Sequence, residues 1–101
     1  MNIDEAIRIV DEIEKLTEFG GSPDPESLET VRRRIFSLRF GLEGDPPIGV
    51  KLASIESWAN ILFSTRKHKR HGGASRVSYF ILRDCITLKD IIRRADALCP
   101  R

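Results

Sequence analysis

Apolar residues recur at steps of three and four along most of the chain, which is the spacing of one buried face of an α-helix. The first such stripe consists of Ile3, Ile7, Val10 and Ile13, with acidic residues between its members. Asn2 precedes the stripe and Glu5 follows three residues later, as in a capping box. The pattern therefore predicts a helix capped by Asn2.

Two further stripes predict two more helices. One begins at Asp24-Pro25 and consists of Leu28, Val31, Ile35, Leu38 and Leu42. Proline suits the first helical position because its missing N–H has no partner there. The next stripe starts near Val50 and consists of Leu52, Ile55, Ala59 and Leu62. Between these helices, Pro46-Pro47 predicts an extended turn, since a residue before proline is disfavoured in the α region.

The C-terminal third is less regular. Residues 76–86 contain Val77, Ile81 and Cys85 at helical spacing, but their β-branched and aromatic neighbours also suit a buried strand. We favour a helix because the chain offers no second strand for pairing. A last helix is predicted from Thr87, with Leu88, Ile91, Ile92, Ala95 and Leu98 as its stripe. The expected fold is therefore a single all-α domain, residues 1–101, built as a compact bundle of four to five helices.

Composition sets the class of protein but not its activity. The 101 residues are 41% hydrophobic and 32% charged, which argues against disorder over the whole chain. No apolar run approaches the 18 residues of a membrane span, and the acidic N-terminus is unlike a signal peptide. Cys85 and Cys99 are too few for a disulfide framework. We expect a cytoplasmic protein without membrane attachment.

Charge is distributed unevenly along the chain, although the formal net charge is only +2. Residues 1–30 hold nine acidic and two basic side chains, giving −7, whereas residues 31–101 hold fifteen basic and six acidic ones, giving +9. Two interpretations follow. The basic part binds an acidic partner, or the two parts neutralise each other within one folded domain.

The densest basic segment predicts a binding surface. It comprises Arg66, Lys67, His68, Lys69, Arg70 and His71. Its helical context and the following Gly72-Gly73 predict a charged tail at the end of the third helix. The leading hypothesis is a non-enzymatic module that binds nucleic-acid backbone without base specificity, because lysine and arginine displace counterions from phosphates. Further arginines that extend the surface are Arg32, Arg33, Arg34, Arg39, Arg93 and Arg94. A solvated helix end, which aids solubility alone, is the simplest alternative.

A second class of function is a protein–protein adaptor or inhibitor that uses the same charges against an acidic protein. Phe36 and Phe40 favour it, because they widen the apolar part of the second helix beyond one buried stripe. A helix apolar over much of its circumference is either central or has a second partner. These two residues are therefore a candidate protein interface, for another protein or for a homodimer.

Catalytic and metal chemistry is not expected from the residues alone. His68 and His71 stand three residues apart, but cations surround them and no carboxylate or thiolate is near in sequence. Phosphate-binding glycine motifs are also absent. We accordingly predict no catalytic residue, no metal and no cofactor.

One short motif points to a third class of function. Arg66 and His71 form an R-x4-H pattern, with Trp58 ahead of it and Gly72 directly after the histidine. This stretch resembles the signature of HEPN-type helical ribonucleases, in which arginine and histidine from facing subunits cleave RNA without a metal. The resemblance covers about 15 residues. It implies that Arg66 stabilises phosphate charge and that His71 handles the proton.

Overall fold

The chain folds into four long helices and one short helix in a computed structural model that describes residues 1–18, 25–42 and 46–98. The side chains of Pro25, Thr65, His68 and residues 95–98 lie outside this description. The helices are α1 (Ile3–Thr17), α2 (Pro25–Gly41), α3 (Pro46–Leu62), α4 (Thr65–Arg70) and α5 (Ala74–Leu98). Every regular element in the described ranges is helical, which confirms the all-α prediction.

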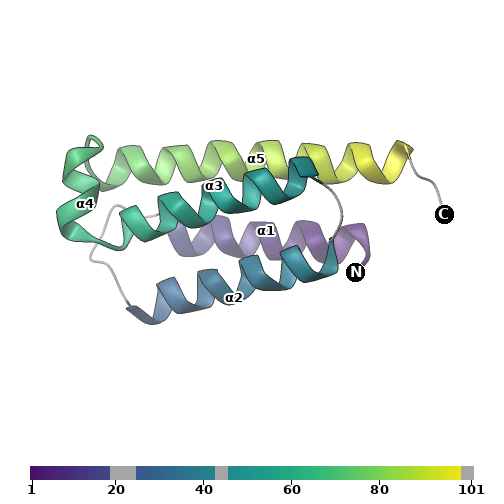
Figure 1. The fold of residues 1–101 in the computed structure, drawn as a ribbon, viewed down its shortest axis with the longest axis horizontal. Coiled ribbons are helices and arrows are strands. Elements are labelled where there is room, and N and C mark those ends of the chain that lie inside the picture. The colour runs from purple at the N-terminus through teal and green to yellow at the C-terminus, as the bar shows by residue number, and fades with distance from the viewer. Residues whose placement is uncertain (19–24, 43–45, 99–101) are drawn as a thin grey trace.

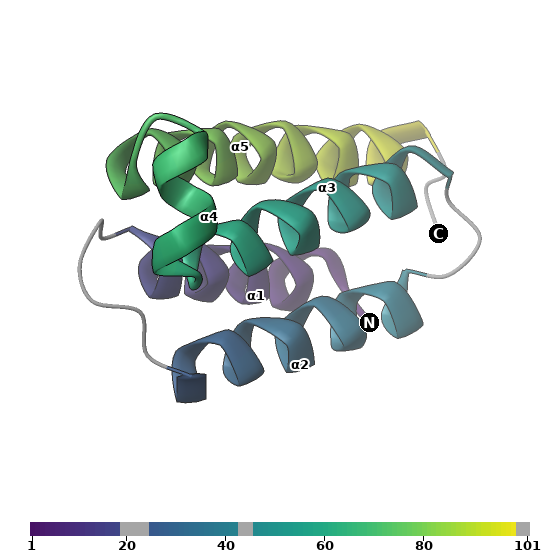
Figure 2. The same cartoon turned by 60° about the vertical axis from the view of Figure 1, so that its left-hand side comes forward.

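The four long helices pack side by side with alternating directions, and α4 crosses one end of the bundle (Figure 1). Each long helix contacts two others, in the ring order α1, α2, α3, α5. The molecule is elongated, 45 × 22 × 19 Å, and the turned view in Figure 2 shows α4 standing across the ends of α3 and α5. The start of α1 and the end of α5 lie at the end of the bundle away from α4 (Figure 1). Within the described ranges, no helix combines the length and apolarity that crossing a bilayer demands.

The predicted stripes form the core. In α1, Val10 and Ile13 are fully buried, and Ile3 and Ile7 pack at the margin of the core. From α2, Val31, Ile35 and Leu38 are fully buried. Asn2 caps α1 as predicted, since its Oδ1 accepts a hydrogen bond from the Glu5 backbone N–H at 2.8 Å.

Helix α3 begins earlier than the sequence suggested. Pro46 and Pro47 form its first turn instead of an extended turn, and Val50 is already inside the helix. The prediction was wrong because the first N–H groups of a helix have no intrahelical partner, so both prolines fit there without losing a hydrogen bond. The predicted stripe is correct, with Leu52, Ile55 and their partners facing the core.

Two other boundaries differ from the prediction. The basic segment is not the tail of α3, because the chain leaves that helix after Leu62 and starts α4 at Thr65. Residues 76–86 and the predicted last helix are one continuous helix, α5, so Thr87 is an interior residue and not a cap. Val77, Ile81, Cys85 and Leu88 are all fully buried and share one face of α5, which makes a break at Thr87 unnecessary.

Candidate nucleic-acid interface

A local capping interaction separates α4 from α3. The Ser64 hydroxyl oxygen and the Ser64 carbonyl both accept from the Lys67 backbone N–H, at 3.3 and 3.0 Å. A serine before a helix stabilises the open N–H groups of its first turn. On the other side, Gly72 and Gly73 adopt φ values of +93° and +99°, which allow the chain to reverse into α5. The basic residues therefore project from a short helix at the end of the bundle.

The cations of α4 are exposed to solvent. Arg66, Lys67, Lys69 and Arg70 all belong to the exposed class. In the described part of the chain, no ion pair involves any of the four. His71, directly after α4, is exposed as well, whereas the predicted contribution of the His68 side chain lies outside the description. We call Arg66, Lys67, Lys69 and Arg70 the basic end.

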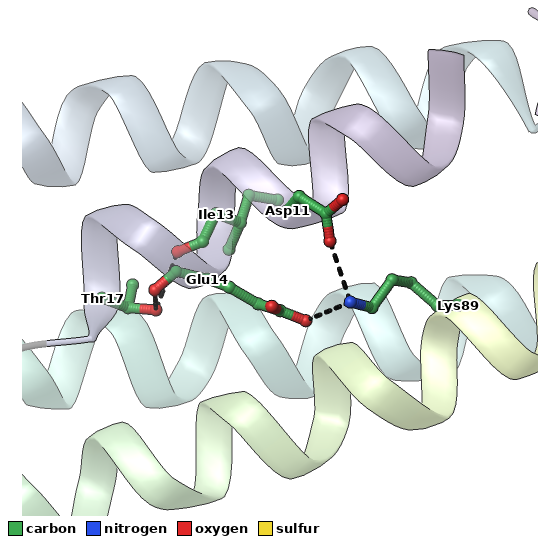
Figure 3. A network of polar contacts seen from close by, with 5 residues as sticks. All are labelled: Asp11, Ile13, Glu14, Thr17 and Lys89. Carbon is green, nitrogen blue, oxygen red and sulfur yellow. Dashed lines mark hydrogen bonds and ion pairs between the residues drawn. The ribbon is translucent and has the colours of Figure 1, made fainter. Parts of the chain in front are cut away.

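Three acidic side chains of α1 are paired with bases outside α4. Lys89 of α5 places its Nζ 2.8 Å from Asp11 Oδ1 and 2.7 Å from Glu14 Oε1 (Figure 3). Glu12 pairs with Arg34 of α2 at 2.8 Å. Neutralisation within the domain is therefore real, but it joins α1 to α2 and α5 and leaves the basic end uncompensated by these three carboxylates. Glu18, at the end of α1, lines a hollow with Ser75 and Tyr79 in the first turns of α5, and within the described ranges it forms no ion pair with the cations of α4.

The Lys89 network also connects α1 to α5. Burial alone would lower the pKa of Lys89, but hydrogen bonds to Asp11 and Glu14 outweigh it and raise the pKa above the ordinary lysine value. Nearby, the Thr17 hydroxyl donates to the Ile13 carbonyl at 2.8 Å, so this buried hydroxyl is satisfied inside α1 (Figure 3). Lys89 is thus a structural cation and is unavailable to a ligand.

The arginines predicted to extend the surface do not all do so. Arg32 donates to Asn60 Oδ1 at 2.6 Å, and Asn60 lies near the end of α3, so Arg32 is held toward the basic end. Arg33 is exposed and lies 3.9 Å from Glu29 on its own helix. Arg34 does not extend the surface, because it turns toward α1 to meet Glu12.

The remaining arginines of the prediction lie elsewhere. Arg39 is 4.0 Å from Glu56 of α3. Arg94 pairs with Asp90 at 2.9 Å. Arg93 is 17 residues beyond Arg76 on α5, about 26 Å along a helix that rises 1.5 Å per residue. Arg93 and Arg94 therefore stand near the opposite end of the bundle from α4.

Arg76 lies beside the basic end, although it was not among the arginines predicted to extend this surface. It is exposed in the first turn of α5, and its guanidinium lies 5.6 Å from the centre of the Phe80 ring. A Cβ added to Gly72 would collide with the Arg76 side chain, which shows that this arginine lies against the turn after α4. Gly72 and Gly73 are the sequence feature that could have predicted this position, because a tight reversal at these glycines brings the first turn of α5 beside α4.

The motif that resembles HEPN ribonucleases maps onto this same surface. Arg66 lies in α4 and is exposed, and His71 lies in the turn after it. The His71 ring meets Trp58 of α3 edge-on, with ring centres 5.5 Å apart and planes at 89°. The half-buried Trp58 also packs against Phe80 of α5, with ring centres 4.9 Å apart. The rings of Trp58 and Phe80 therefore lie at the interface between α3 and α5.

Phe36 and Phe40 are the most exposed large apolar residues of α2. Their side chains are 67% and 75% exposed, and the rings stack with centres 6.4 Å apart. They point away from the core that Val31, Ile35 and Leu38 form. Beside Phe36 lies a hollow of about 510 Å³, whose other lining residues are Glu29, Arg32, Arg33, Ser37, Arg39 and Glu56.

Reactive and metal-binding groups are sparse in the described ranges. No group of three or more histidine, cysteine, aspartate or glutamate side chains there is placed to hold a metal. Cys85 is a free thiol in the core, and burial, reinforced by the nearby Glu14, raises its pKa from 9.0 to about 12. Such a thiol stays protonated and unreactive at neutral pH. Cys99 lies outside the described residues.

Comparisons with models of protein families, with curated protein sequences and with solved structures found no match to this chain.

Proposed function

We propose that this chain is a non-enzymatic module that binds the sugar–phosphate backbone of nucleic acid through the basic end. One observation carries the proposal. Four exposed cations are concentrated on a six-residue helix and form no ion pair within residues 1–18, 25–42 and 46–98, while Asp11, Glu12 and Glu14 are paired with other bases. A cluster of unpaired cations raises the local potential and attracts polyanions. Arg76 adds a fifth cation beside it, and Arg32 is held on the same side by Asn60.

The geometry favours recognition of phosphate rather than of base sequence. The basic end consists of long, mobile cationic side chains on a short helix, and phosphate contacts from such side chains fix position without reading sequence. The helix that holds the basic end has only six residues, too short to present a row of base-reading side chains along a major groove. We therefore propose binding with little discrimination between sequences.

A charge-matched pair of variants tests the proposal. In the first, Arg66, Lys67, Lys69 and Arg70 are replaced by alanine, which keeps helix propensity high in α4. In the second, the same number of exposed cations is removed elsewhere, at Arg8, Lys15, Arg93 and Arg94. Binding to a fluorescent 20-nucleotide RNA or DNA is followed by anisotropy, and circular dichroism checks that both variants are folded.

The expected result is loss of binding only in the α4 variant. If both variants lose affinity equally, total charge and not the basic end drives the interaction, and the assignment is wrong. Loss of intact RNA during incubation with the wild type, abolished by both Arg66→Ala and His71→Ala, would instead identify the ribonuclease that the motif resembles.

A second candidate function, a protein–protein adaptor, is favoured by Phe36 and Phe40. The two rings stack on each other, and the residues are 67% and 75% exposed. Contact with a partner would bury this apolar surface. The neighbouring Arg32, Arg33 and Arg39 suit carboxylates around an apolar centre, so we propose an acidic protein as the partner of this surface. Replacing both phenylalanines with serine should abolish capture of such a protein and leave nucleic-acid binding intact. A shift from dimer to monomer in light scattering would identify a second copy as the occupant.

A further inference from the structure

A small hollow lies between α3 and α5 beside the basic end. Its volume is about 200 Å³, and its lining residues are Lys51, Trp58, Phe80, Arg83, Asp84 and Thr87. Trp58 connects it to the basic end, because its ring also meets His71, the residue that follows Arg70. The hollow and the cations of α4 are therefore neighbours on one surface of the molecule. We call this hollow the aromatic pocket.

The chemistry of the aromatic pocket suits a flat, uncharged ring. Trp58 and Phe80 supply aromatic carbon to the lining, with ring centres 4.9 Å apart and planes at 38°. Asp84 accepts from Lys51 Nζ at 3.3 Å and from the Ser54 hydroxyl at 2.5 Å, so the lysine charge is already balanced. Arg83 is a second cation of the lining, 5.9 Å from the centre of the Tyr79 ring, and it can meet a phosphate at the edge of the pocket. The Asp84 carboxylate retains lone pairs for an amino group. Most phosphate contacts would still lie on the basic end, where the exposed cations are denser.

We propose that the aromatic pocket receives one unstacked base of a single strand whose phosphates lie on the basic end. This inference rests on the proposed nucleic-acid binding and adds the class of ligand. The pocket is smaller than the roughly 300–1,000 Å³ of sites for drug-sized molecules, which suits a single ring system. Bases in a duplex are stacked and paired, and extracting one costs free energy, so single strands bind in preference to duplexes. Stacking on aromatic side chains tolerates different bases, in keeping with weak sequence preference.

The single tryptophan of the chain makes the proposal directly measurable. Because Trp58 lines the pocket, its fluorescence reports on occupancy without an added label. We compare a 12-nucleotide oligodeoxycytidine with an abasic strand of the same length and phosphate count. The expected result is quenching of Trp58 by the base-containing strand alone. The base-containing strand should also bind about tenfold more tightly, the typical contribution of one stacked base.

Two variants separate the pocket from the surrounding surface. Thr87 is exposed at the pocket, so Thr87→Phe should fill the space without disturbing the core. Ile86→Phe is the matched control, since it places the same side chain at an exposed neighbouring position that does not line the pocket. Thr87→Phe should reduce affinity for the base-containing strand to that of the abasic strand. Ile86→Phe should change neither affinity nor quenching.

The outcomes distinguish this inference from the function on which it rests. If both strands bind with equal affinity and neither quenches Trp58, the proposed backbone binding stands, but the proposal that the aromatic pocket receives a base is refuted. If neither strand binds at 50 mM salt, the proposed backbone binding and the proposed base-binding role of the pocket are both refuted. If Thr87→Phe binds each strand with the same affinity as the wild type does, and circular dichroism shows that the variant is folded, the proposed role of the pocket is also refuted.

Discussion

Replacing Lys89 with methionine tests the account of how the charges are arranged. Methionine keeps an unbranched apolar stem but removes the ammonium that lies between Asp11 and Glu14. The Lys89 side chain is only 17% exposed and that of Glu14 only 20%, so Glu14 would be left with an uncompensated, largely buried charge. The attraction that connects α1 to α5 would then be replaced by repulsion between the Asp11 and Glu14 carboxylates.

The magnitude follows from burial. Removing one partner of a fully buried ion pair costs about 3–5 kcal/mol. Asp11 is 49% exposed, so water can solvate it when the lysine is lost, and the penalty falls mainly on Glu14. We therefore expect a loss of about 2–3 kcal/mol in the free energy of unfolding. For a domain of this size, that corresponds to a decrease in Tm of roughly 10–20 °C.

The pH dependence has a definite sign. The folded-state pKa of Lys89 is raised by its two carboxylate partners, although burial opposes them. A raised pKa means that the stabilisation is complete below the ordinary lysine value of about 10.4 and is lost as pH rises through the folded value. The wild type should accordingly lose this contribution only above about pH 10.4, and Lys89→Met should lack that alkaline component.

Urea unfolding followed by circular dichroism measures the effect. Arg94→Met is the control, because Arg94 and Asp90 are 75% and 53% exposed and such a pair contributes less than about 1 kcal/mol. Equal midpoints and equal slopes for the Lys89 and Arg94 variants would refute the reasoning, since Lys89 would then be no more than a surface cation.

Three further predictions concern the core, the buried thiol and the turn after α4. Leu38→Ala should destabilise the fold by about 2–5 kcal/mol in urea unfolding, whereas Phe40→Ser should cost under about 0.5 kcal/mol, and similar losses would contradict the assigned faces of α2. In a Cys99→Ser background, Cys85 should react with a thiol reagent at pH 8 only when urea unfolds the chain, because its pKa is about 12; rapid reaction in the native state would disprove its burial. Gly73→Ala should cost about 1–2 kcal/mol although space for the methyl group is open, because φ is +99°, and an unchanged Tm would show that the turn relaxes freely.

The sequence predicted the elements whose stripe and cap agree. In α1, the apolar spacing and the cap at Asn2 point to the same helix, and both are confirmed. The prediction from the sequence was wrong where a local capping pattern indicated a helix end but the buried face continues without a break. Thr87 has a capping-box partner at Asp90, yet Cys85 and Leu88 continue one buried face through it. Continuous packing of α5 against α1 and α3 outweighs the local signal.

The candidate surface was predictable in part. The density of cations between residues 66 and 71 is visible in the sequence, and it remains exposed after folding. Which arginines join it depends on tertiary contacts that are remote in sequence. Arg34 forms an ion pair with Glu12 of α1. Arg76 lies beside α4 because the chain reverses direction at Gly72 and Gly73. The aromatic pocket was not predictable, because Trp58 and Phe80 meet only when α3 packs against α5.

The salt dependence of binding measures how many cations of the protein neutralise phosphates. If the four α4 cations and Arg76 each neutralise one phosphate of a single strand, log K should fall with log salt at a slope of about −3.5, and removing the four should bring it to about −0.7. Affinity of the wild type should then drop on the order of a hundredfold between 50 and 200 mM salt. A slope near zero, or a slope unchanged in the α4 variant, would contradict the account.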